Sequence, residues 1–202
     1  MNRPRPKARI SRALGIPLTP KCVRYFERRP YPPGVHGRRR RTSSDYAVRL
    51  LEKQRLRHQY NVSEGQLRRV FTEASRRPGA TGDNLVTLLE LRLDATVLRS
   101  GFARTIYQAR QTVTHRHVLV NGKRVDKPSY RLRPEDVVEI APVSRVKPPF
   151  VVAAAGAHAL ARPVGYLSVD LAGLRATVLR VPERTEVPVI CETQLVVEFY
   201  SR

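Results

Sequence analysis

The sequence has little of what supports disulfide bonds, metal sites or large aromatic clusters. Its 202 residues include no Trp, one Met and two Cys, and only 6% are aromatic. The two cysteines, Cys22 and Cys191, lie far apart and form no Cys-x-x-Cys pair, whereas a closed structural zinc site needs about four ligands. We therefore expect no disulfide framework, no metal and no cofactor, in a reducing intracellular compartment, the cytoplasm.

Long apolar runs and catalytic motifs are also missing. The longest apolar run, residues 150–161, is interrupted by Gly156 and His158 and is too short to span a bilayer. Residues 1–4 show no signal-peptide pattern. The chain contains no Gly-rich phosphate loop, no His-Glu-x-x-His and no Gly-x-Ser-x-Gly. We therefore expect no membrane segment, no small-molecule substrate and no enzyme activity.

Acidic residues are scarce as well. The chain has 17 Asp and Glu against 38 Lys and Arg, and its net charge of +21 would repel itself unless a polyanion neutralised it. Residues 1–60 hold 17 basic and 3 acidic residues, residues 61–140 hold 14 and 9, and residues 141–202 hold 7 and 5. The N-terminal third is the predicted electrostatic footprint on a nucleic acid, although a basic protein without a polyanionic partner would share this composition.

The first 43 residues are rich in Pro and Arg and have few periodic apolar positions. The turn-forming segment Pro32-Pro33-Gly34 precedes the run Arg38-Arg39-Arg40-Arg41. Such a segment buries little surface by itself, so we expect either an extended arm that orders on its partner or a disordered tail. Tyr25, Phe26 and Tyr31 lie among arginines, where they could stack on unpaired bases or anchor the arm to the body of the protein.

Capping signals predict helices after the arm. Ser44 or Ser43 can cap a helix over residues 45–59, and Ser63 opens a capping box for a helix that ends near residue 77. A third helix is predicted over residues 81–99.

The C-terminal third mixes strand and helix patterns. Alternation predicts strands over residues 166–170 and 175–180, and an apolar face predicts a helix around residues 195–200. Residues 148–163 fit either a short helix or a loop.

Residues 91–142 carry the clearest local signals. Thr105 caps a short helix, with Gln108 completing a capping box, and Asn121-Gly122 fits the type I′ turn of a hairpin. Ile106, Ala109 and Val113 follow helical spacing and form an apolar inward face, whereas the other face bears polar donors, with basic groups beside the turn. The residues therefore predict a helix-loop-helix followed by a β-hairpin.

These residues resemble the RNA-binding domain named after small-subunit ribosomal protein S-four. The matching stretches are Arg92-Leu93-Asp94, Arg99-Ser100-Gly101-Phe102-Ala103-Arg104, Ala109-Arg110-Gln111, and His115 to Gly122. Arg28 to Gly37 in the arm and Gln194 to Arg202 at the C-terminus extend the resemblance over nearly the whole chain, to the ribosomal S-four family. Some members hold zinc with four cysteines in the arm, where this chain has only Cys22.

The expected fold is therefore α+β, in three parts. Residues 1–43 form the basic extended arm, and residues 91–142 form the RNA-binding domain of helix-loop-helix and β-hairpin. Residues 44–90 and 143–202 form a helical subdomain with a C-terminal hairpin and helix.

The resemblance implies a structural protein of the small ribosomal subunit. It would bind small-subunit (16S) rRNA as a primary binder, nucleate assembly of the subunit body and contribute to translational accuracy where mRNA enters. The implied neighbours are rRNA, mRNA and ribosomal proteins S-five and S-three. The alternative is a non-ribosomal RNA-binding protein with this domain or an RNA-modification factor, which would need a further catalytic domain.

The expected RNA-binding residues lie in the arm, in the first long helix and in the helix-hairpin module. They are Arg28, Arg29, Tyr31, His36, Arg38, Arg39, Arg40, Arg41, Arg55, Arg104, Arg110, Gln111, His115, Arg116, His117, Asn121 and Lys123.

Overall fold

The computed structural model describes residues 6–38, 44–159 and 163–201. Helices and one five-stranded antiparallel sheet confirm the predicted α+β class. The chain forms two compact units, which are described separately. The first contains residues 1–82 and 189–202, and the second contains residues 83–188.

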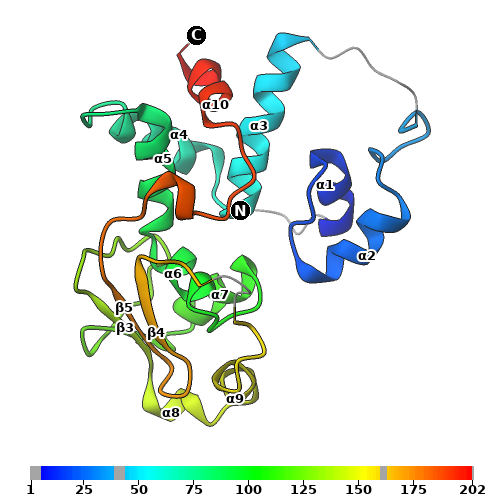
Figure 1. Cartoon of the computed structure of the whole chain (residues 1–202). Coiled ribbons are helices and arrows are strands. Elements are labelled where there is room, and N and C mark those ends of the chain that lie inside the picture. The colour runs from blue at the N-terminus through cyan, green and yellow to red at the C-terminus, as the bar shows by residue number, and fades with distance from the viewer. Residues whose placement is uncertain (1–5, 39–43, 160–162, 202) are drawn as a thin grey trace. The chain divides into compact units, whose positions relative to one another are not determined.

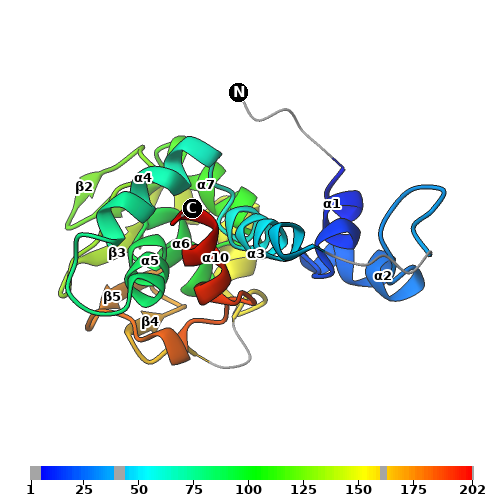
Figure 2. The same cartoon turned by 90° about the horizontal axis from the view of Figure 1, so that it is seen from above.

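The first unit is helical, and its main helices begin where the capping residues predict. α3 (Asp45–Gln59) follows Ser44, whose Oγ accepts a hydrogen bond from the backbone N–H of Ala47 at 3.3 Å. α4 (Glu64–Ala74) follows a complete capping box and ends three residues before the predicted position. α10 (Thr193–Tyr200) confirms the predicted terminal helix and lies alongside α3 in both views (Figures 1 and 2).

The N-terminal residues differ from the expected extended arm because they contain two short helices. α1 (Lys7–Leu14) and α2 (Pro20–Arg28) pack on each other (Figure 1). Gly15 ends α1 in the left-handed conformation, at φ 69°, and Pro20 begins α2, where its missing N–H leaves no bond unmade. The apolar residues buried beside these helices are Leu14, Ile16 and Cys22. Their small number explains why the sequence pattern did not reveal the helices.

Near the start of the second unit, the single helix predicted over residues 81–99 is interrupted. Two helices are present instead, α5 (Thr81–Glu90) and α6 (Leu93–Arg99). Arg92 between them is extended, with φ −73° and ψ 143°, and forms an isolated antiparallel bridge with Arg131. The break is therefore set by a segment distant in sequence, which the local helical pattern could not show.

The sheet has the strand order β2-β1-β3-β5-β4. Its strands are β1 (Val118–Val120), β2 (Lys123–Arg124), β3 (Val137–Ile140), β4 (Leu167–Asp170) and β5 (Arg175–Val178). The β1–β2 register pairs Leu119 with Arg124, as the type I′ turn predicts.

The C-terminal hairpin continues this sheet, because β5 pairs with β3 as well as with β4. The structure thus groups the hairpin with the helix-hairpin module, and not with the helices where the sequence-based division placed it. The remaining elements of this unit are α7 (Ile106–Thr114), α8 (Pro142–Arg145), α9 (Pro148–Ala154) and the 3₁₀ turn η1 (Arg184–Glu186). A helix within residues 148–163 was one of the two expected alternatives.

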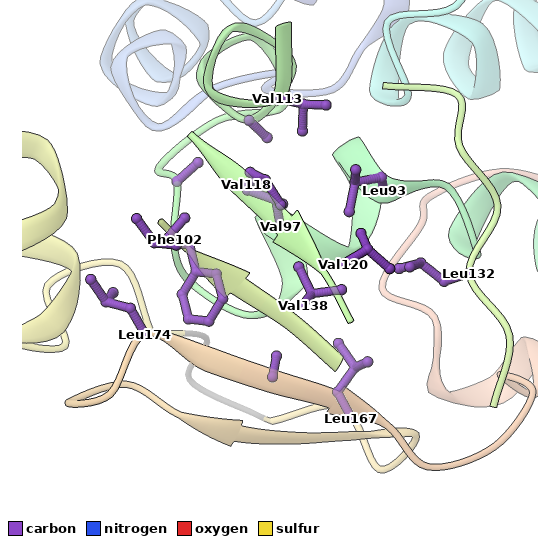
Figure 3. Packing of buried hydrophobic residues seen from close by; sticks show 14 of the residues in the cluster. Leu93, Val97, Phe102, Val113, Val118, Val120, Leu132, Val138, Leu167 and Leu174 are labelled. Atoms are coloured by element: carbon purple, nitrogen blue, oxygen red, sulfur yellow. The ribbon is translucent and has the colours of Figure 1, made fainter. Parts of the chain in front are cut away.

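One apolar core holds the second unit together. Leu93 and Val97 of α6 and the ring of Phe102 face Val118 and Val138 of the sheet, and all five are 0% exposed (Figure 3). The inward side chains of α7, predicted from their spacing, are also buried: Ile106, Ala109 and Val113. Burial of this apolar surface fixes α7 against the sheet and leaves its polar face outward.

Two buried ion pairs accompany this core. Arg92 donates two hydrogen bonds to Asp94, at 2.9 and 2.7 Å, and the Asp94 carboxylate is 0% exposed. Glu90, also 0% exposed, accepts hydrogen bonds from Arg99 and from the hydroxyl of Tyr166, each at 2.5 Å. Both carboxylates are therefore satisfied by donors inside the fold, which offsets the unfavourable desolvation of their charges.

Removing the Asp94 carboxylate should destabilise the fold strongly. In Asp94→Ala, the Arg92 guanidinium would stay buried without its partner, and breaking such a pair costs about 3–5 kcal/mol. The free energy of unfolding from urea titrations measures the effect. The control is Glu73→Ala, which removes an exposed partner of Arg77 and should change stability by less than about 1 kcal/mol. Similar small losses in both variants would contradict the structural role of the Asp94 pair.

Candidate nucleic-acid interface

The outward face of α7 and the β1–β2 hairpin form a basic, donor-rich surface. Its exposed residues are Arg104, Gln111, His115, Arg116, Lys123 and Arg124. Thr105 caps α7 by accepting a hydrogen bond from the backbone N–H of Gln108 at 3.2 Å, so the donors stand on a helix with a fixed start. Arg124 was not among the predicted site residues, although its place opposite Leu119 in the hairpin follows from the turn.

Arg110 lies on this surface but is half-buried against Asp94. Its Nη1 lies 3.9 Å from Oδ2 of Asp94, and its side chain is 34% exposed. The buried carboxylate therefore attracts one side of the Arg110 guanidinium, while about a third of the side chain remains open to solvent. Arg110 is suited to contact a phosphate in an orientation set by the core.

Asn121 is engaged within the protein. Its Nδ2 donates to Oδ1 of Asp136 at 2.8 Å, and its Oδ1 accepts from the backbone N–H of Val137 at 2.8 Å. The predicted contact of its side chain with RNA would compete with these two bonds. In the structure Asn121, at φ 50°, shapes the turn that presents Lys123.

Arg116 forms an exposed ion pair beside the hairpin. Its Nη2 lies 3.0 Å from Oδ2 of Asp126, and the two side chains are 67% and 43% exposed. An exposed pair of this kind is weak, about 0–1 kcal/mol. A phosphate could therefore replace Asp126 as the partner of Arg116 at little cost to the stability of the fold.

The two histidines of the module have different environments. His115 is exposed, whereas His117 is half-buried, with Nδ1 2.9 Å from the hydroxyl of Ser144 and its ring edge-on to Phe150 at 5.5 Å. Burial, together with the positive charge of Lys147, lowers the pKa of His117 below its usual value. His117 thus supports the hairpin from inside, while His115 is placed for a ligand.

Arg12, which the sequence did not single out, organises the second basic surface, in the arm. Its Nε donates to the backbone carbonyls of Arg29 and Tyr31, both at 3.0 Å. The guanidinium carbons of Arg12 and Arg38 lie 5.0 and 4.9 Å from the centre of the Tyr31 ring, and Arg38 also donates to the Tyr31 hydroxyl at 3.2 Å. This hydrogen bond lowers the pKa of the Tyr31 hydroxyl. Tyr31 therefore joins α1 to the turn after α2 within the arm, and these contacts differ from the expected anchoring of the arm to the body of the protein.

The other predicted residues of the first unit differ in their contacts. Arg28, Arg29 and His36 are exposed. Arg55 instead donates to the carbonyl of Leu14 at 2.8 Å and to Glu52 at 2.5 Å, so it fastens α1 to α3. The predicted residues Arg39, Arg40 and Arg41 lie outside the described residues.

Further exposed arginines, Arg68 and Arg69, stand on α4 and were not predicted. They flank the buried Leu67 and Val70, so helical periodicity alone would have placed them outward. Across residues 6–38, 44–159 and 163–201, three or more His, Cys, Asp or Glu nowhere gather as they would around a metal ion. In the same ranges, every helix lacks the length and apolar character that crossing a bilayer requires.

The sequence of the chain matches two family models and several proteins of known name. A family model described as "Ribosomal protein S4/S9 N-terminal domain" matches residues 2–90, and one described as "S4 domain" matches residues 91–138. A Beutenbergia cavernae protein named "Small ribosomal subunit protein uS4" is 63% identical over 99% of this chain and 98% of the relative. Proteins of the same name from Micrococcus luteus and Streptomyces coelicolor are 61% and 58% identical, over 99% and 100% of this chain and 98% and 99% of the relatives.

Protonation of His117 should destabilise the fold at acid pH. Because its pKa is lower in the folded than in the unfolded chain, the unfolded chain takes up a proton first as the pH falls below about 6.5. Stability contributed by neutral His117 is present above that pH and is lost as the pH falls through the folded-state pKa. Urea unfolding between about pH 7.5 and 5.5 should therefore show a smaller loss of stability in His117→Gln than in the native chain.

His36→Gln is the matched control, since His36 is exposed in the arm. It should lose as much stability as the native chain over the same pH range. Identical pH dependence of the native chain and His117→Gln would refute the role assigned to the buried imidazole.

Proposed function

The chain belongs to the uS4 family of small ribosomal subunit proteins, and on this premise we propose that it binds small-subunit (16S) rRNA directly. In this role it is a structural component of the small ribosomal subunit, in the cytoplasm, and not an enzyme. The family models and the relatives' names support this assignment over the whole chain.

The observation that carries the proposal is the uneven pairing of charges. Asp94, Glu90 and Glu52 are held by arginines inside the fold. By contrast, exposed basic residues gather on the outward face of α7 with its hairpin, and again in the arm. A polyanion that contacts both surfaces would neutralise this excess, and release of its counterions would drive binding.

Shape is the basis of recognition in this proposal. The deep major groove of an RNA helix hides its base edges from side chains, so a protein reads the backbone and the arrangement of helices. Within the second unit Asp94 orients Arg110, and within the first unit the ring of Tyr31 lies against Arg38, so each surface by itself presents oriented donors. Such an arrangement suits a junction of RNA helices better than a single duplex.

The finer assignments follow from the family resemblance. We propose that the chain is a primary binder that nucleates assembly of the subunit body, next to ribosomal proteins S-five and S-three. A contribution to translational accuracy where mRNA enters belongs to the same proposal. The alternative, an RNA-modification factor or other non-ribosomal binder, is not favoured, because the matched relatives are covered at 98–99% of their own length.

Salt titration of RNA binding tests the proposed function. If about ten phosphates are neutralised, the logarithm of the binding constant should fall against the logarithm of salt concentration with a slope of roughly −7 to −9. The five-prime domain of small-subunit rRNA should stay bound at salt concentrations that release an unrelated duplex of equal length. Release of both RNAs along one line would reduce the function to non-specific binding.

Deleting residues 1–43 should weaken rRNA binding and flatten the salt dependence. The deletion removes 13 basic residues and only one acidic residue, Glu27, and each lost phosphate contact reduces the slope by about 0.7–0.9. Circular dichroism should show that the sheet of the second unit remains, since its core lies within residues 83–188. Unchanged affinity and slope would show that the arm is not part of the interface.

A further inference from the structure

A hollow in the arm has the chemistry of a nucleotide site. It has a volume of about 450 Å³ and lies among α1, the end of α2 and the turn that follows. Its lining includes Arg9, Arg12, Arg28, Arg29, Tyr25 and Pro33. The volume falls within the ~300–1,000 Å³ typical of small-ligand sites.

The wall of this hollow is held in place before any ligand binds. Arg12 donates from Nε to the carbonyls of Arg29 and Tyr31 and from Nη2 to that of Pro32, at 3.0, 3.0 and 3.4 Å. One side chain of α1 therefore fixes the backbone that carries Arg29 and Pro33. A site with a fixed wall loses less conformational entropy when it binds.

The remaining cations of the hollow are uncompensated. Among the described residues, the guanidinium groups of Arg9, Arg28 and Arg29 have neither a hydrogen-bond nor an ion-pair partner. Glu27 is the one acidic residue in the first 43, and it does not line the hollow. Three free guanidinium groups around one concave surface repel each other, and a phosphate group offers them shared acceptors.

Tyr25 provides the hollow with an exposed aromatic ring, which a site for phosphate alone does not require. Its side chain is 51% exposed, and the hollow beside it is also walled by Pro33 and Pro6. An exposed aromatic ring next to several arginines is the arrangement on which unpaired bases stack.

A second hollow in the same unit has similar residue types but more ion pairs among its charged residues. It has a volume of about 510 Å³ and also joins an exposed tyrosine, Tyr46, to basic side chains. There two of the three cations are compensated, because Arg49 pairs with Glu198 at 2.7 Å and Lys53 with Glu64 at 3.1 Å, which leaves Arg68. The demand for an anion is therefore smaller than in the hollow beside Tyr25, where three arginines lack a partner.

We propose that the hollow beside Tyr25 takes one unpaired nucleotide of the bound RNA. The base stacks on the Tyr25 ring, and the adjoining phosphate is held by Arg9, Arg28 and Arg29. This inference rests on the proposed function and adds a subsite to it. Because every base has a stacking face, the subsite selects an unpaired nucleotide and not a particular base.

The absence of tryptophan from the sequence allows a direct test. Tyr25→Trp places a single indole in the hollow, and Tyr46→Trp places one in the control hollow. Each full-length variant is titrated with the five-prime domain of small-subunit rRNA, and filter binding on the same samples measures affinity. The Tyr25→Trp fluorescence should be quenched as RNA is added, with the same midpoint that filter binding gives. The Tyr46→Trp fluorescence should keep its intensity.

Substitutions that change stacking give a second readout. Tyr25→Ala should weaken rRNA binding roughly 5- to 150-fold, the range found when an aromatic that stacks on a base is replaced by alanine. Tyr25→Phe should bind like the native chain, because the ring is retained, and Tyr46→Ala should bind like it as well.

Failure of the nucleotide subsite and failure of the proposed function give different results in these experiments. If rRNA binds tightly but neither Tyr25→Trp fluorescence nor Tyr25→Ala affinity responds, the nucleotide subsite is refuted and the proposed function stands. If free AMP quenches Tyr25→Trp at the concentrations effective for RNA, the hollow is a site for free nucleotides, which also overturns the inference. If the native chain fails to bind rRNA, both proposals fall.

Discussion

The surplus of positive charge constrains the rest of this structure. Of the 17 acidic residues, at least ten take part in ion pairs within the protein: Glu52, Glu64, Glu73, Glu90, Asp94, Asp126, Glu139, Glu183, Glu186 and Glu198. Glu52, Glu90 and Asp94 hold arginines inside the fold, whereas the pairs of Glu73, Asp126 and Glu183 are exposed. Few remain to neutralise the outer arginines, so the net charge of +21 is concentrated on surfaces where only an external polyanion can balance it.

Arginine has two distinct roles here, and geometry decides between them. Arg92 is buried against Asp94, Arg55 joins α3 to α1, and Arg12 fixes the turn after α2. Arg104 and Arg28 are exposed instead. Arg110 combines both roles, since Asp94 lies 3.9 Å from one side of it while a third of the side chain faces solvent. An outer arginine whose orientation is set by an inner carboxylate is partly preorganised for binding, so fewer rotamers are lost when RNA binds.

The features predicted correctly from the sequence have local causes. Ser44, Ser63 and Thr105 cap their helices by accepting hydrogen bonds from backbone groups three residues on, and Asn121-Gly122 adopts the positive φ angles that its residue types favour. The features that were missed depend on distant partners. The bridge from Arg92 to Arg131 breaks a helix, and β5 reaches β3 across the sheet. For the candidate site, charge and motif predicted a basic arm and a basic helix-hairpin module, and both carry exposed basic residues. Residue types alone could not separate the internally bonded Asn121 and Arg55 from the exposed Arg104.

The two basic surfaces suit different parts of an RNA. The face of α7 offers guanidinium, amide and imidazole donors on a capped helix, which fits the regular spacing of phosphates on a helical strand. The arm instead brings Tyr25 beside free arginines around a hollow, which fits an unpaired nucleotide. Because one chain carries both surfaces, binding at one raises the effective concentration of RNA at the other, and overall affinity exceeds that of either alone. This gain is lost if the geometry of the RNA prevents simultaneous contact. On the two proposals, an RNA that combines paired and unpaired segments should therefore be preferred over a uniform duplex, without any base-specific hydrogen bond.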